Sequence, residues 1–250
     1  MKKALITGAN KSIGFETARQ LLQKGYYIYL GSRDLENGRQ AVEKLKAEGL
    51  TEVEAICIDV SNSESVKAAR AEMDRKTDVL DVLINNAGVS GAVFSNGQPQ
   101  TATGTDISVF EKVFQINVFG VARVTQAFID LLKKSPEPRI VNVSSGLGSL
   151  TSASDPTSKY YNYKFAVYQP SKAALNMYTI SLAYELRDTP FKVNAVDPGF
   201  TATDFNQHRG TGTVEQAGAR IAKYALIDAN GPTGKFFSEE FNPATGEVAW

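Results

Sequence analysis

The chain alternates short apolar runs rich in β-branched residues with longer amphipathic runs, and this alternation constrains the fold more than any other feature. Strands are expected at residues 4–7, 27–31, 53–58, 82–85, 139–143, 192–196 and 235–237, and helices at 13–24, 35–48, 62–75, 107–133, 167–187 and 214–226. Several strand runs are apolar throughout, as is typical of strands covered on both sides. The pattern predicts an α/β fold with a single doubly wound parallel β-sheet, helices on both faces and right-handed crossovers.

The chain shows no linker, low-complexity tract or internal repeat, so a single domain over residues 1–250 is expected. Hydrophobic residues make up 42% of it, which is enough for a substantial core. In such a sheet, ligands bind beyond the carboxyl ends of the strands where the strand order reverses. We expect a cofactor-binding half over about residues 1–145 and a substrate-binding, catalytic half over about residues 146–250.

Charge and cysteine content exclude several classes of protein. Lys plus Arg and Asp plus Glu each number 27, which argues against a nucleic acid or membrane surface bound through bulk electrostatics. The single cysteine, Cys57, cannot form an internal disulfide and is expected to pack as a small apolar residue. No apolar stretch approaches ~18 residues and the start lacks a signal-peptide core, so we expect a cytoplasmic protein. No metal site is expected.

A glycine-containing turn follows the first strand and opens the first helix. It reads Thr-Gly-Ala-Asn-Lys-Ser-Ile-Gly over residues 7–14. Gly8 allows a tight turn, Gly14 allows close packing of the helix on the sheet, and the helix N-terminus offers free N–H groups to a pyrophosphate. This context is typical of a dinucleotide-binding turn in a Rossmann fold, although such a turn can also be purely structural.

Two cations indicate which dinucleotide is bound. Arg33 directly follows the second strand, where NAD-binding folds carry an acidic residue for the ribose 2′-hydroxyl. A guanidinium there can hold a 2′-phosphate through two hydrogen bonds, and Lys11 can approach the same phosphate. Asp34 can partly neutralise Arg33, and both cations can instead be solvated surface charges. We predict a preference for NADPH, with NADH less favoured.

Two further strand ends carry residues suited to the cofactor. Asp59 and Val60 follow the third strand, where the carboxylate can accept a hydrogen bond from an adenine amino group. Asp59 can instead cap the next helix, a role for which Ser61 and Asn62 are better placed. The fourth strand ends in Asn-Asn-Ala-Gly at residues 85–88, a turn that suits close approach of the backbone to a ribose.

Taken in order along the chain, these motifs and several later ones resemble the short-chain dehydrogenase/reductase family. The later motifs are Asn117, Ser145, Tyr168-Gln169-Pro170-Ser171-Lys172 and Pro198-Gly199, and the resemblance covers nearly the whole chain. It implies an oxidoreductase whose cofactor contacts lie at Gly8, Asn10, Lys11, Ser12, Ile13, Gly14, Arg33, Asp59, Val60, Asn86, Ala87, Gly88, Tyr168, Lys172, Pro198, Gly199, Thr201 and Thr203.

The resemblance also implies a catalytic set of Asn117, Ser145, Tyr168 and Lys172. Tyr168 would protonate the alkoxide as hydride reaches a carbonyl carbon. Lys172, at i+4 on the same helix face, would lower the phenol pKa from its usual value of ~10 and hold the nicotinamide ribose. Ser145 would polarise the carbonyl, with the neighbouring Ser144 as a rival that the family spacing disfavours. Asn117 would hold a water that relays protons through Lys172.

A second tyrosine and lysine pair competes for the proton-donor role. Tyr160 and Lys164 have the same spacing as Tyr168 and Lys172, and Tyr160 lies nearer to Ser145 in the sequence. We choose Tyr168 because its motif continues into a long amphipathic helix, whereas the residues around Tyr160 read as a loop.

The stretch after the sixth strand is expected to close the site. Pro198-Gly199 would bring Thr201 to the nicotinamide carboxamide, and Thr203 can reach the amide or the pyrophosphate. Residues 204–213 lack apolar periodicity and are interpreted as a mobile substrate lid. His208, within it, is expected to be a surface residue.

The chain departs from the family pattern in two places. Ser12 replaces the middle glycine, so its β-carbon crowds the pyrophosphate while its hydroxyl can bond a phosphate oxygen. The segment between Ser145 and Tyr168 is longer than usual, which resembles the carbonyl reductase branch and leaves a homodimer, a homotetramer or a monomer open. We expect it to shape a substrate mouth that also contains Tyr161, Tyr163, Phe200 and Phe205.

The function implied is NADPH-dependent reduction of a small ketone or aldehyde to an alcohol. One alternative is an alcohol dehydrogenase of the same family that works mainly in oxidation, which Arg33 disfavours. Another is a redox sensor that binds the dinucleotide without turnover, which would not need Tyr168 as a proton donor.

Overall fold

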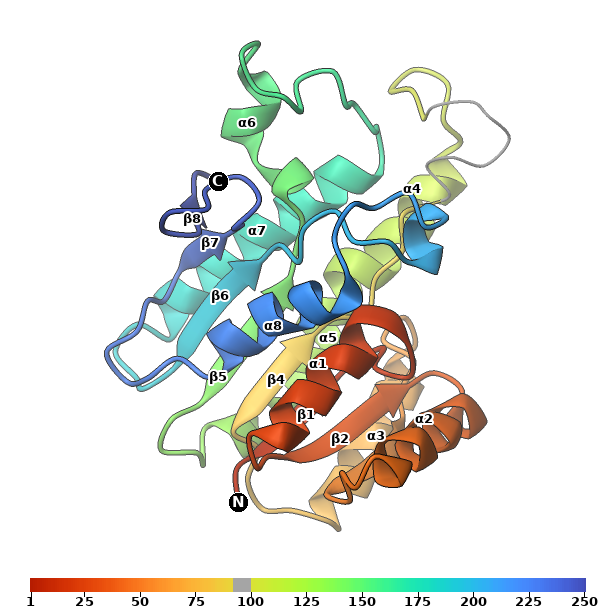
Figure 1. Ribbon diagram of the computed structural model, residues 1–250, viewed down its shortest axis with the longest axis vertical. Helices are drawn as coiled ribbons and strands as arrows, with labels where there is room; N and C mark the ends of the chain where they lie inside the picture. The colour runs from red at the N-terminus through yellow and green to blue at the C-terminus, as the bar shows by residue number, and fades with distance from the viewer. Residues whose placement is uncertain (92–99) are drawn as a thin grey trace.

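The computed structural model describes residues 1–91 and 100–250, and this part of the chain contains one eight-stranded sheet (Figure 1). The strand order is β3-β2-β1-β4-β5-β6-β7-β8. The strands are β1 (Lys3–Ile6), β2 (Tyr27–Ser32), β3 (Val53–Cys57), β4 (Val82–Asn85), β5 (Arg139–Val143), β6 (Lys192–Val196), β7 (Lys235–Phe237) and β8 (Glu247–Val248). All neighbours pair in parallel except β7 and β8, which are antiparallel. The predicted doubly wound parallel sheet is confirmed, and the antiparallel β8 is an addition that its two residues could not signal.

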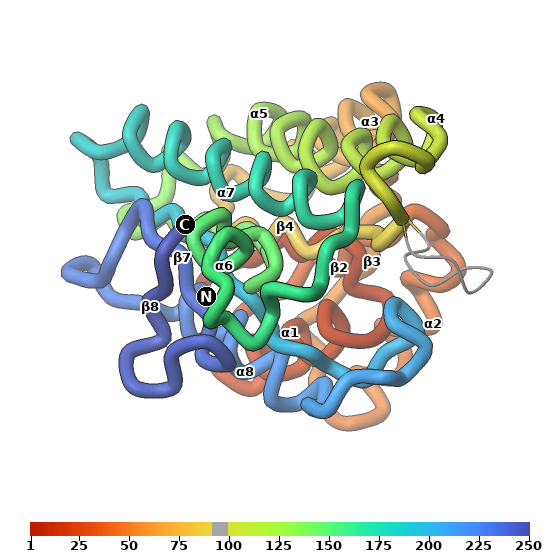
Figure 2. Tube along the Cα trace, turned by 90° about the horizontal axis from the view of Figure 1, so that it is seen from above, coloured from red at the N-terminus to blue at the C-terminus, as the bar shows by residue number. Residues whose placement is uncertain are grey.

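Helices lie in two layers, one on each face of the sheet (Figure 2). One layer holds α1 (Ser12–Gln23), α2 (Leu35–Ala47) and α8 (Val214–Ala225), and the other holds α3 (Ser63–Asp74), α5 (Val121–Leu132) and α7 (Tyr168–Glu185). The shorter α6 (Leu150–Ser154) lies beyond the carboxyl ends of the strands (Figure 1). None of the helices in the described ranges is long and apolar enough to cross a lipid bilayer.

The first strand shows why the strand runs are apolar throughout. Ala4, Leu5 and Ile6 are all completely buried. Because successive side chains of a strand point to opposite faces, Ala4 and Ile6 join the core under α1, α2 and α8, whereas Leu5 joins the core under α3, α5 and α7. A strand with helices on both sides therefore needs apolar residues at every position.

Two helix ends follow the local signals of the sequence. Gly25, at a φ of +80°, ends α1, and its N–H donates to the carbonyl of Leu22 at 2.9 Å. Asn62 begins α3, and its side-chain oxygen accepts from the backbone N–H groups of Glu64 and Ser65. Asn62 is one of the two residues that the sequence favoured as the cap of this helix.

The single long helix predicted over residues 107–133 is interrupted. It consists of α4 (Ile107–Phe114), a π-helical segment (Gln115–Gly120) and α5. At Gly120 the helix packs so closely on Val60 that an added β-carbon would lie 2.9 Å from the valine Cγ2. Such wider turns occur mostly at functional sites, and here the π-helical segment carries the buried Asn117. Hydrophobic periodicity could not show this feature, because an apolar pattern does not distinguish a π-helical turn from an α-helical one.

Two irregular segments lie at the carboxyl end of the sheet. Residues 146–167 contain a 3-10 turn (Gly146–Gly148), α6 and a non-helical stretch that leads to α7. Residues 201–213 contain a 3-10 turn (Asp204–Asn206), and Thr201 forms a parallel bridge with Gly212. The interpretation of residues 204–213 as irregular therefore holds apart from one short turn, while their movement as a lid stays a prediction.

Candidate active site

The strand order reverses at β1, which pairs with β2 on one side and with β4 on the other. The turn after β1 has the backbone that its glycines predict. Gly8 has a φ of +63°, and a β-carbon there would lie 3.0 Å from the Cα of Ala87. At Gly14 a β-carbon would lie 2.5 Å from the Asn86 side chain. The turn after β1 and the turn after β4 are thus packed directly against each other.

Hydrogen bonds of Thr7 and Asn86 join these two turns. The Thr7 hydroxyl accepts from the backbone N–H groups of Asn86 and Ala87, each at 3.0 Å. The Asn86 amide donates to the carbonyls of Thr7 at 2.8 Å and Gly8 at 3.0 Å. Sequence reasoning placed Asn86 and Ala87 at the site but missed Thr7, whose position directly before Gly8 is the signal that could have found it.

Ser12 occupies a backbone conformation that favours glycine. Its φ is +56°, in the left-handed region where a β-carbon costs about 1–2 kcal/mol. This explains why glycine suits the position better than serine. Lys11 precedes α1 without a side-chain cap, so the first-turn N–H groups of the helix have no side-chain acceptor. Free N–H groups at a helix N-terminus attract phosphate oxygens.

The two cations expected at the 2′-phosphate differ in their surroundings. Arg33 is exposed at the end of β2, and within the described ranges it makes no ion pair. Asp34 does not neutralise it, because the Asp34 carboxylate accepts from the Asn37 N–H at 3.0 Å as the N-cap of α2. Lys11, in contrast, donates to Asp204 at 2.8 Å. The structure thus leaves Arg33 available to a ligand and pairs Lys11 with the segment after β6.

Among the described residues, only one oxygen of the Asp59 carboxylate accepts hydrogen bonds. Its Oδ1 accepts from the Ser61 backbone at 2.9 Å and from the Ser61 hydroxyl at 2.7 Å, while Asn62 provides the cap of α3. Oδ2 has no partner among the residues that the structure describes. Val60 is buried against Gly120. Asp59 therefore retains one oxygen for a ligand.

Tyr168 and Lys172 begin α7 and lie together at the carboxyl ends of the strands. Tyr168 is the first residue of the helix. Pro170 lies in the first turn, where a backbone N–H would have no helical acceptor, so the missing N–H of proline costs no helical hydrogen bond. The Lys172 side chain is 5% exposed, and its Nζ donates to the carbonyl of Val143 at 2.8 Å. Nζ lies 5.8 Å from the centre of the Tyr168 ring.

Asn117 is completely buried and fastens the backbone after β4. Its side-chain oxygen accepts from the Val89 N–H and its amide donates to the Val89 carbonyl, each at 2.9 Å. The amide also donates to the Ser171 hydroxyl of α7 at 3.1 Å. A β-carbon on Gly88 would lie 3.4 Å from Asn117 Oδ1 and 3.7 Å from Lys172 Nζ. The turn after β4, the π-helical segment and α7 therefore meet at one point.

The structure separates Ser145 from its rival. The Ser145 hydroxyl lies near enough to the Tyr168 phenol to lower its pKa, and it accepts from the Leu147 N–H at 3.3 Å. Ser144 is buried and donates to Asn176 at 2.6 Å, on the inner side of α7. Of the two serines, Ser145 is the one whose hydroxyl faces Tyr168.

The competing tyrosine and lysine do not form a pair. Tyr160 lies outside any helix, donates to Glu240 and stacks on Phe241 with ring centres 4.4 Å apart. Lys164 donates to the carbonyls of Ala153, at 3.0 Å, and Tyr161. Only Tyr168 and Lys172 therefore have the arrangement that the family motif requires.

Burial governs the acid–base properties of the cluster. Burial raises the pKa of the Tyr168 phenol above its ordinary value, and the hydrogen bond from Ser145 opposes the rise. The sequence predicted that Lys172 would lower the phenol pKa, so the direction differs from the prediction. Removal of the phenol from water has a larger effect on its pKa than Lys172 has, because burial also disfavours the charged form of the lysine. Burial lowers the pKa of the Lys172 ammonium to about 8, and the nearby Asp197 opposes that shift.

The segment after β6 turns back over the cluster. Gly199 has a φ of +85°, and the Thr201 hydroxyl donates to its carbonyl at 3.1 Å. Asn206 donates to the Thr201 carbonyl at 2.8 Å, which holds the turn together. Phe205 lies with its ring centre 5.6 Å from that of Tyr168, in an edge-to-face arrangement. One folded loop that reaches Tyr168 therefore contains Pro198, Gly199, Thr201 and Thr203.

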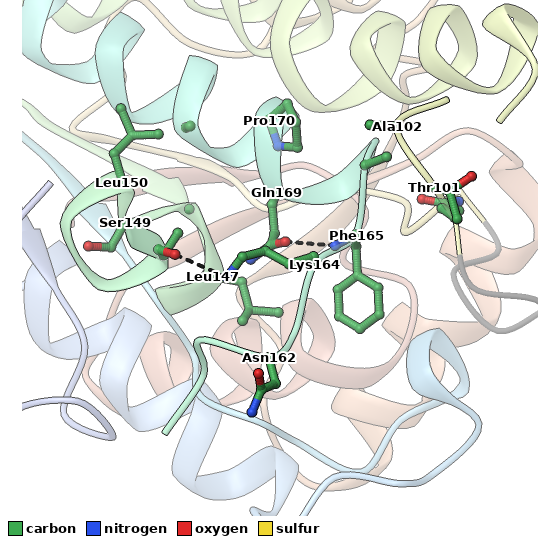
Figure 3. Close-up of a pocket in the computed structure, with 15 residues that line it drawn as sticks. Thr101, Ala102, Leu147, Ser149, Leu150, Asn162, Lys164, Phe165, Gln169 and Pro170 are labelled. Carbon is green, nitrogen blue, oxygen red and sulfur yellow. Dashed lines mark hydrogen bonds between the residues drawn. The ribbon is translucent and has the colours of Figure 1, made fainter. Parts of the chain in front are cut away.

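A cavity of about 860 Å³ adjoins the cluster on the outer side of α7 (Figure 3). Its wall is mainly apolar and is shared by the 146–167 segment, the start of α7 and the stretch from Gln100 to Ala102. Leu147, Phe165 and Gln169 are part of it, and the Gln169 side chain accepts from the Phe165 N–H at 2.7 Å (Figure 3). The long segment before Tyr168 therefore lines an open cavity beside the start of α7.

Comparison with known proteins agrees with this geometry. A sequence model of the short chain dehydrogenase family matches residues 2–213. Short-chain dehydrogenase anuI from Penicillium roqueforti is 35% identical over 226 residues, which cover 88% of this chain and 87% of that protein. The structure of salutaridine reductase from Papaver somniferum matches 95% of this chain and 100% of its own, with a TM-score of 0.82 and 30% identity.

NADPH-bound carbonyl reductase from chicken fatty liver also has a TM-score of 0.82, at 25% identity, over 100% of this chain and 99% of its own. The chain therefore belongs to the short-chain dehydrogenase/reductase family of oxidoreductases, and the resemblance found in its motifs is confirmed. Members of this family use a nicotinamide dinucleotide.

Proposed function

We propose that this chain is an NADPH-dependent carbonyl reductase that converts a ketone or an aldehyde into an alcohol. The observation that carries the proposal is the convergence of Ser145, Tyr168 and Lys172 at the carboxyl ends of β5 and β6. A sensor without turnover would not need this arrangement. An oxidising alcohol dehydrogenase would use the same residues in the reverse direction, and it is disfavoured by the exposed Arg33.

The residues of the first turn fit a phosphorylated dinucleotide. The positive φ angles at Gly8 and Ser12 shape a backbone cradle, and the uncapped start of α1 offers N–H donors to the pyrophosphate. Arg33 is exposed and without a carboxylate partner in the described ranges, so its guanidinium is available to a 2′-phosphate. The relation to a carbonyl reductase solved with NADPH supports the same choice.

Tyr168 is suited to give up a proton to the substrate oxygen. Because burial raises the pKa of the phenol, it is protonated at neutral pH, as a proton donor must be. The Ser145 hydroxyl, which lies near the same phenol, would donate to the carbonyl oxygen and polarise it. NADPH, when bound, supplies the hydride that the carbonyl carbon receives.

Lys172 and Asn117 support this transfer from the protein side. The Lys172 ammonium, held by the Val143 carbonyl, favours the phenolate that remains after Tyr168 has lost its proton. Asn117 keeps the turn after β4 in place through its two hydrogen bonds to Val89. The polar groups are thereby positioned before the substrate arrives, which lowers the reorganisation that the reaction needs.

The surroundings of the cluster favour a substrate with an apolar body. Phe205 covers the Tyr168 ring, and Leu147 and Phe165 line the adjoining cavity.

The test is turnover of NADPH and NADH, followed at the nicotinamide absorbance, with a panel of apolar ketones, aldehydes, quinones and diketones. The proposal predicts oxidation of NADPH that depends on the carbonyl compound and exceeds that of NADH. Tight binding of NADPH with no turnover across the panel would support the sensor instead. Efficient reduction of NADP⁺ by alcohols, with negligible reaction in the other direction, would support the oxidising dehydrogenase.

A further inference from the structure

Three acidic side chains are buried in the described part of the chain, and one of them lies at the catalytic end of the sheet. Glu16 pairs with Arg19, and Asp81 lies at the amino end of β4. Asp197, which is 6% exposed, directly follows β6 and makes no ion pair with any described residue. A buried carboxylate without a contacting cation is costly unless hydrogen bonds stabilise it.

The hydrogen bonds of Asp197 favour its ionised form. The Ser238 hydroxyl donates to Oδ2 at 2.6 Å and the Gly199 N–H donates to Oδ1 at 3.0 Å. The N–H of Gly146, next to Ser145, is also bonded to the carboxyl. Backbone N–H groups can only donate, and a carboxylate that accepts several such bonds is stabilised as the anion.

The sheet register places this carboxylate beside Lys172. Val143 of β5 and Val196 of β6 are paired, and Lys172 Nζ donates to the Val143 carbonyl at 2.8 Å. Asp197 is one residue beyond Val196. The ammonium and the carboxylate therefore lie at adjacent strand ends, both shielded from water, where opposite charges interact more strongly than at the surface.

We propose that Asp197 is the counter-charge that keeps the buried Lys172 protonated, and that it acts as a positioning residue without touching the substrate. The proposal rests on the role given to Lys172 under the proposed function. Burial lowers the pKa of Lys172, and the charge of Asp197 is the influence that opposes this shift. Burial also raises the pKa of the Asp197 carboxyl, while the bonds from Ser238, Gly199 and Gly146 oppose that rise.

Few other charges face this pair. Glu240, after β7, raises the pKa of Asp197. The charge of Asp197 in turn raises the pKa of Tyr160 and of Tyr168. Arg220 of α8 donates to the Pro198 carbonyl at 2.8 Å, and its guanidinium lies 3.5 Å from Glu239. Among the described groups, Asp197 is the one whose charge acts on Lys172.

The test compares pH profiles of kcat/KM for carbonyl reduction in the wild type and in Asp197→Asn. The wild type is expected to lose activity as pH rises through about 8, where Lys172 loses its proton. In Asp197→Asn this alkaline limb should move down by about one pH unit, because an opposite charge has been removed. Activity at pH 6 should change by less than about threefold, whereas Asp197→Glu should keep the wild-type limb. An unmoved limb in active Asp197→Asn overturns the proposal.

Asp81→Asn is the matched control. Asp81 is also 6% exposed and accepts from a serine hydroxyl at 2.6 Å and a backbone N–H at 2.8 Å, but it lies at the opposite end of the sheet. It should cost stability without moving the alkaline limb. If Asp197→Asn does not fold, Ser238→Ala takes its place, because loss of that donor weakens the anion, and the limb should move down by a smaller amount. An unmoved limb in this variant likewise contradicts the proposal.

A readout without turnover separates this proposal from the proposed function. The folded pKa of Lys172 lies below its unfolded value, so the protonated lysine destabilises the fold and stability rises as pH increases through the folded pKa. In urea unfolding, the rise in the free energy of unfolding should begin at a pH about one unit lower in Asp197→Asn than in the wild type or Asp81→Asn. Coincident onsets overturn the role of Asp197. If the onsets differ but the wild type does not reduce carbonyl compounds, only the proposed function is contradicted.

Discussion

The cluster around Tyr168 and the exposed cations Lys11 and Arg33 lie at the same edge of the sheet but are built in opposite ways. In the cluster, Asn117 and Lys172 are almost inaccessible to water, and each has a fixed partner within the fold. Lys11 and Arg33 are exposed, and the ion pair of Lys11 joins side chains that are 65% and 63% exposed. Buried polar groups are costly to disturb, whereas exposed charges are screened by solvent. We therefore expect large effects on chemistry from the cluster and smaller, selective effects on cofactor choice from the cations.

The largest effect is expected from Lys172→Met. Turnover should fall by about 10²–10⁴-fold, the range associated with loss of acid–base assistance. Stability at pH 7 should fall, because the change removes the cation that faces the buried Asp197 carboxylate. Lys164→Met, at the competing position, should leave turnover within about twofold. Steady-state kinetics and thermal unfolding measure both, and equal losses in the two variants would contradict the comparison.

Arg33→Ala should change cofactor choice. Loss of charge-assisted hydrogen bonds to a phosphate is worth about 1.5–3 kcal/mol, so kcat/KM for NADPH should fall by roughly 10–100-fold while that for NADH stays nearly constant. Arg39→Ala removes an equally exposed arginine from α2 and should have no such effect. A parallel loss with both cofactors would show that Arg33 does not read the 2′-phosphate.

Asp204→Asn should sharpen the preference for NADPH. The carboxylate holds Lys11 at 2.8 Å, so its neutralisation frees the ammonium for the cofactor. An exposed ion pair contributes about 0–1 kcal/mol, which corresponds to a fall in KM for NADPH of up to about fivefold and no change for NADH. Added salt should abolish the difference. Glu137→Gln breaks a similarly exposed pair with Lys2 at the other end of the sheet and should leave both KM values unchanged.

The sequence predicted the parts of the site that depend on local pattern. Strand ends follow from apolar runs, and the start of α7 follows from the spacing of Tyr168 and Lys172 with Pro170 between them. The π-helical segment at Asn117 escaped prediction, because an apolar pattern does not distinguish it from the α-helix on either side.

Interactions between distant segments were equally inaccessible to sequence reasoning. Lys11 and Asp204 lie 193 residues apart, and no local pattern links them. Asp197 stands next to the recognised Pro198-Gly199 turn, but its proximity to Lys172 follows only from the register of β5 and β6. The spacing predicted that Lys172 would lower the phenol pKa of Tyr168, whereas burial raises it. The extent of this burial could not be judged from the spacing.

The smallest effect is expected from Ser12→Gly. Glycine relieves the strain of a φ of +56°, so the unfolding free energy should rise by about 0.5–1 kcal/mol after the added freedom of the unfolded chain is considered. Ser61→Gly, a change of the same kind in an exposed turn, should bring no gain. Urea unfolding measures both, and a destabilised Ser12→Gly would indicate that the serine hydroxyl contributes more than its backbone strain removes.

The most direct measurement of the central claim compares Tyr168→Phe with Tyr160→Phe in NADPH-dependent carbonyl reduction. Tyr168 lies near Ser145 and Lys172, whereas Tyr160 donates to Glu240. The account predicts that Tyr168→Phe retains NADPH binding and loses about 10²-fold or more in kcat, and that Tyr160→Phe keeps kcat within a few fold. Near-wild-type turnover by Tyr168→Phe, or a loss confined to Tyr160→Phe, would contradict it.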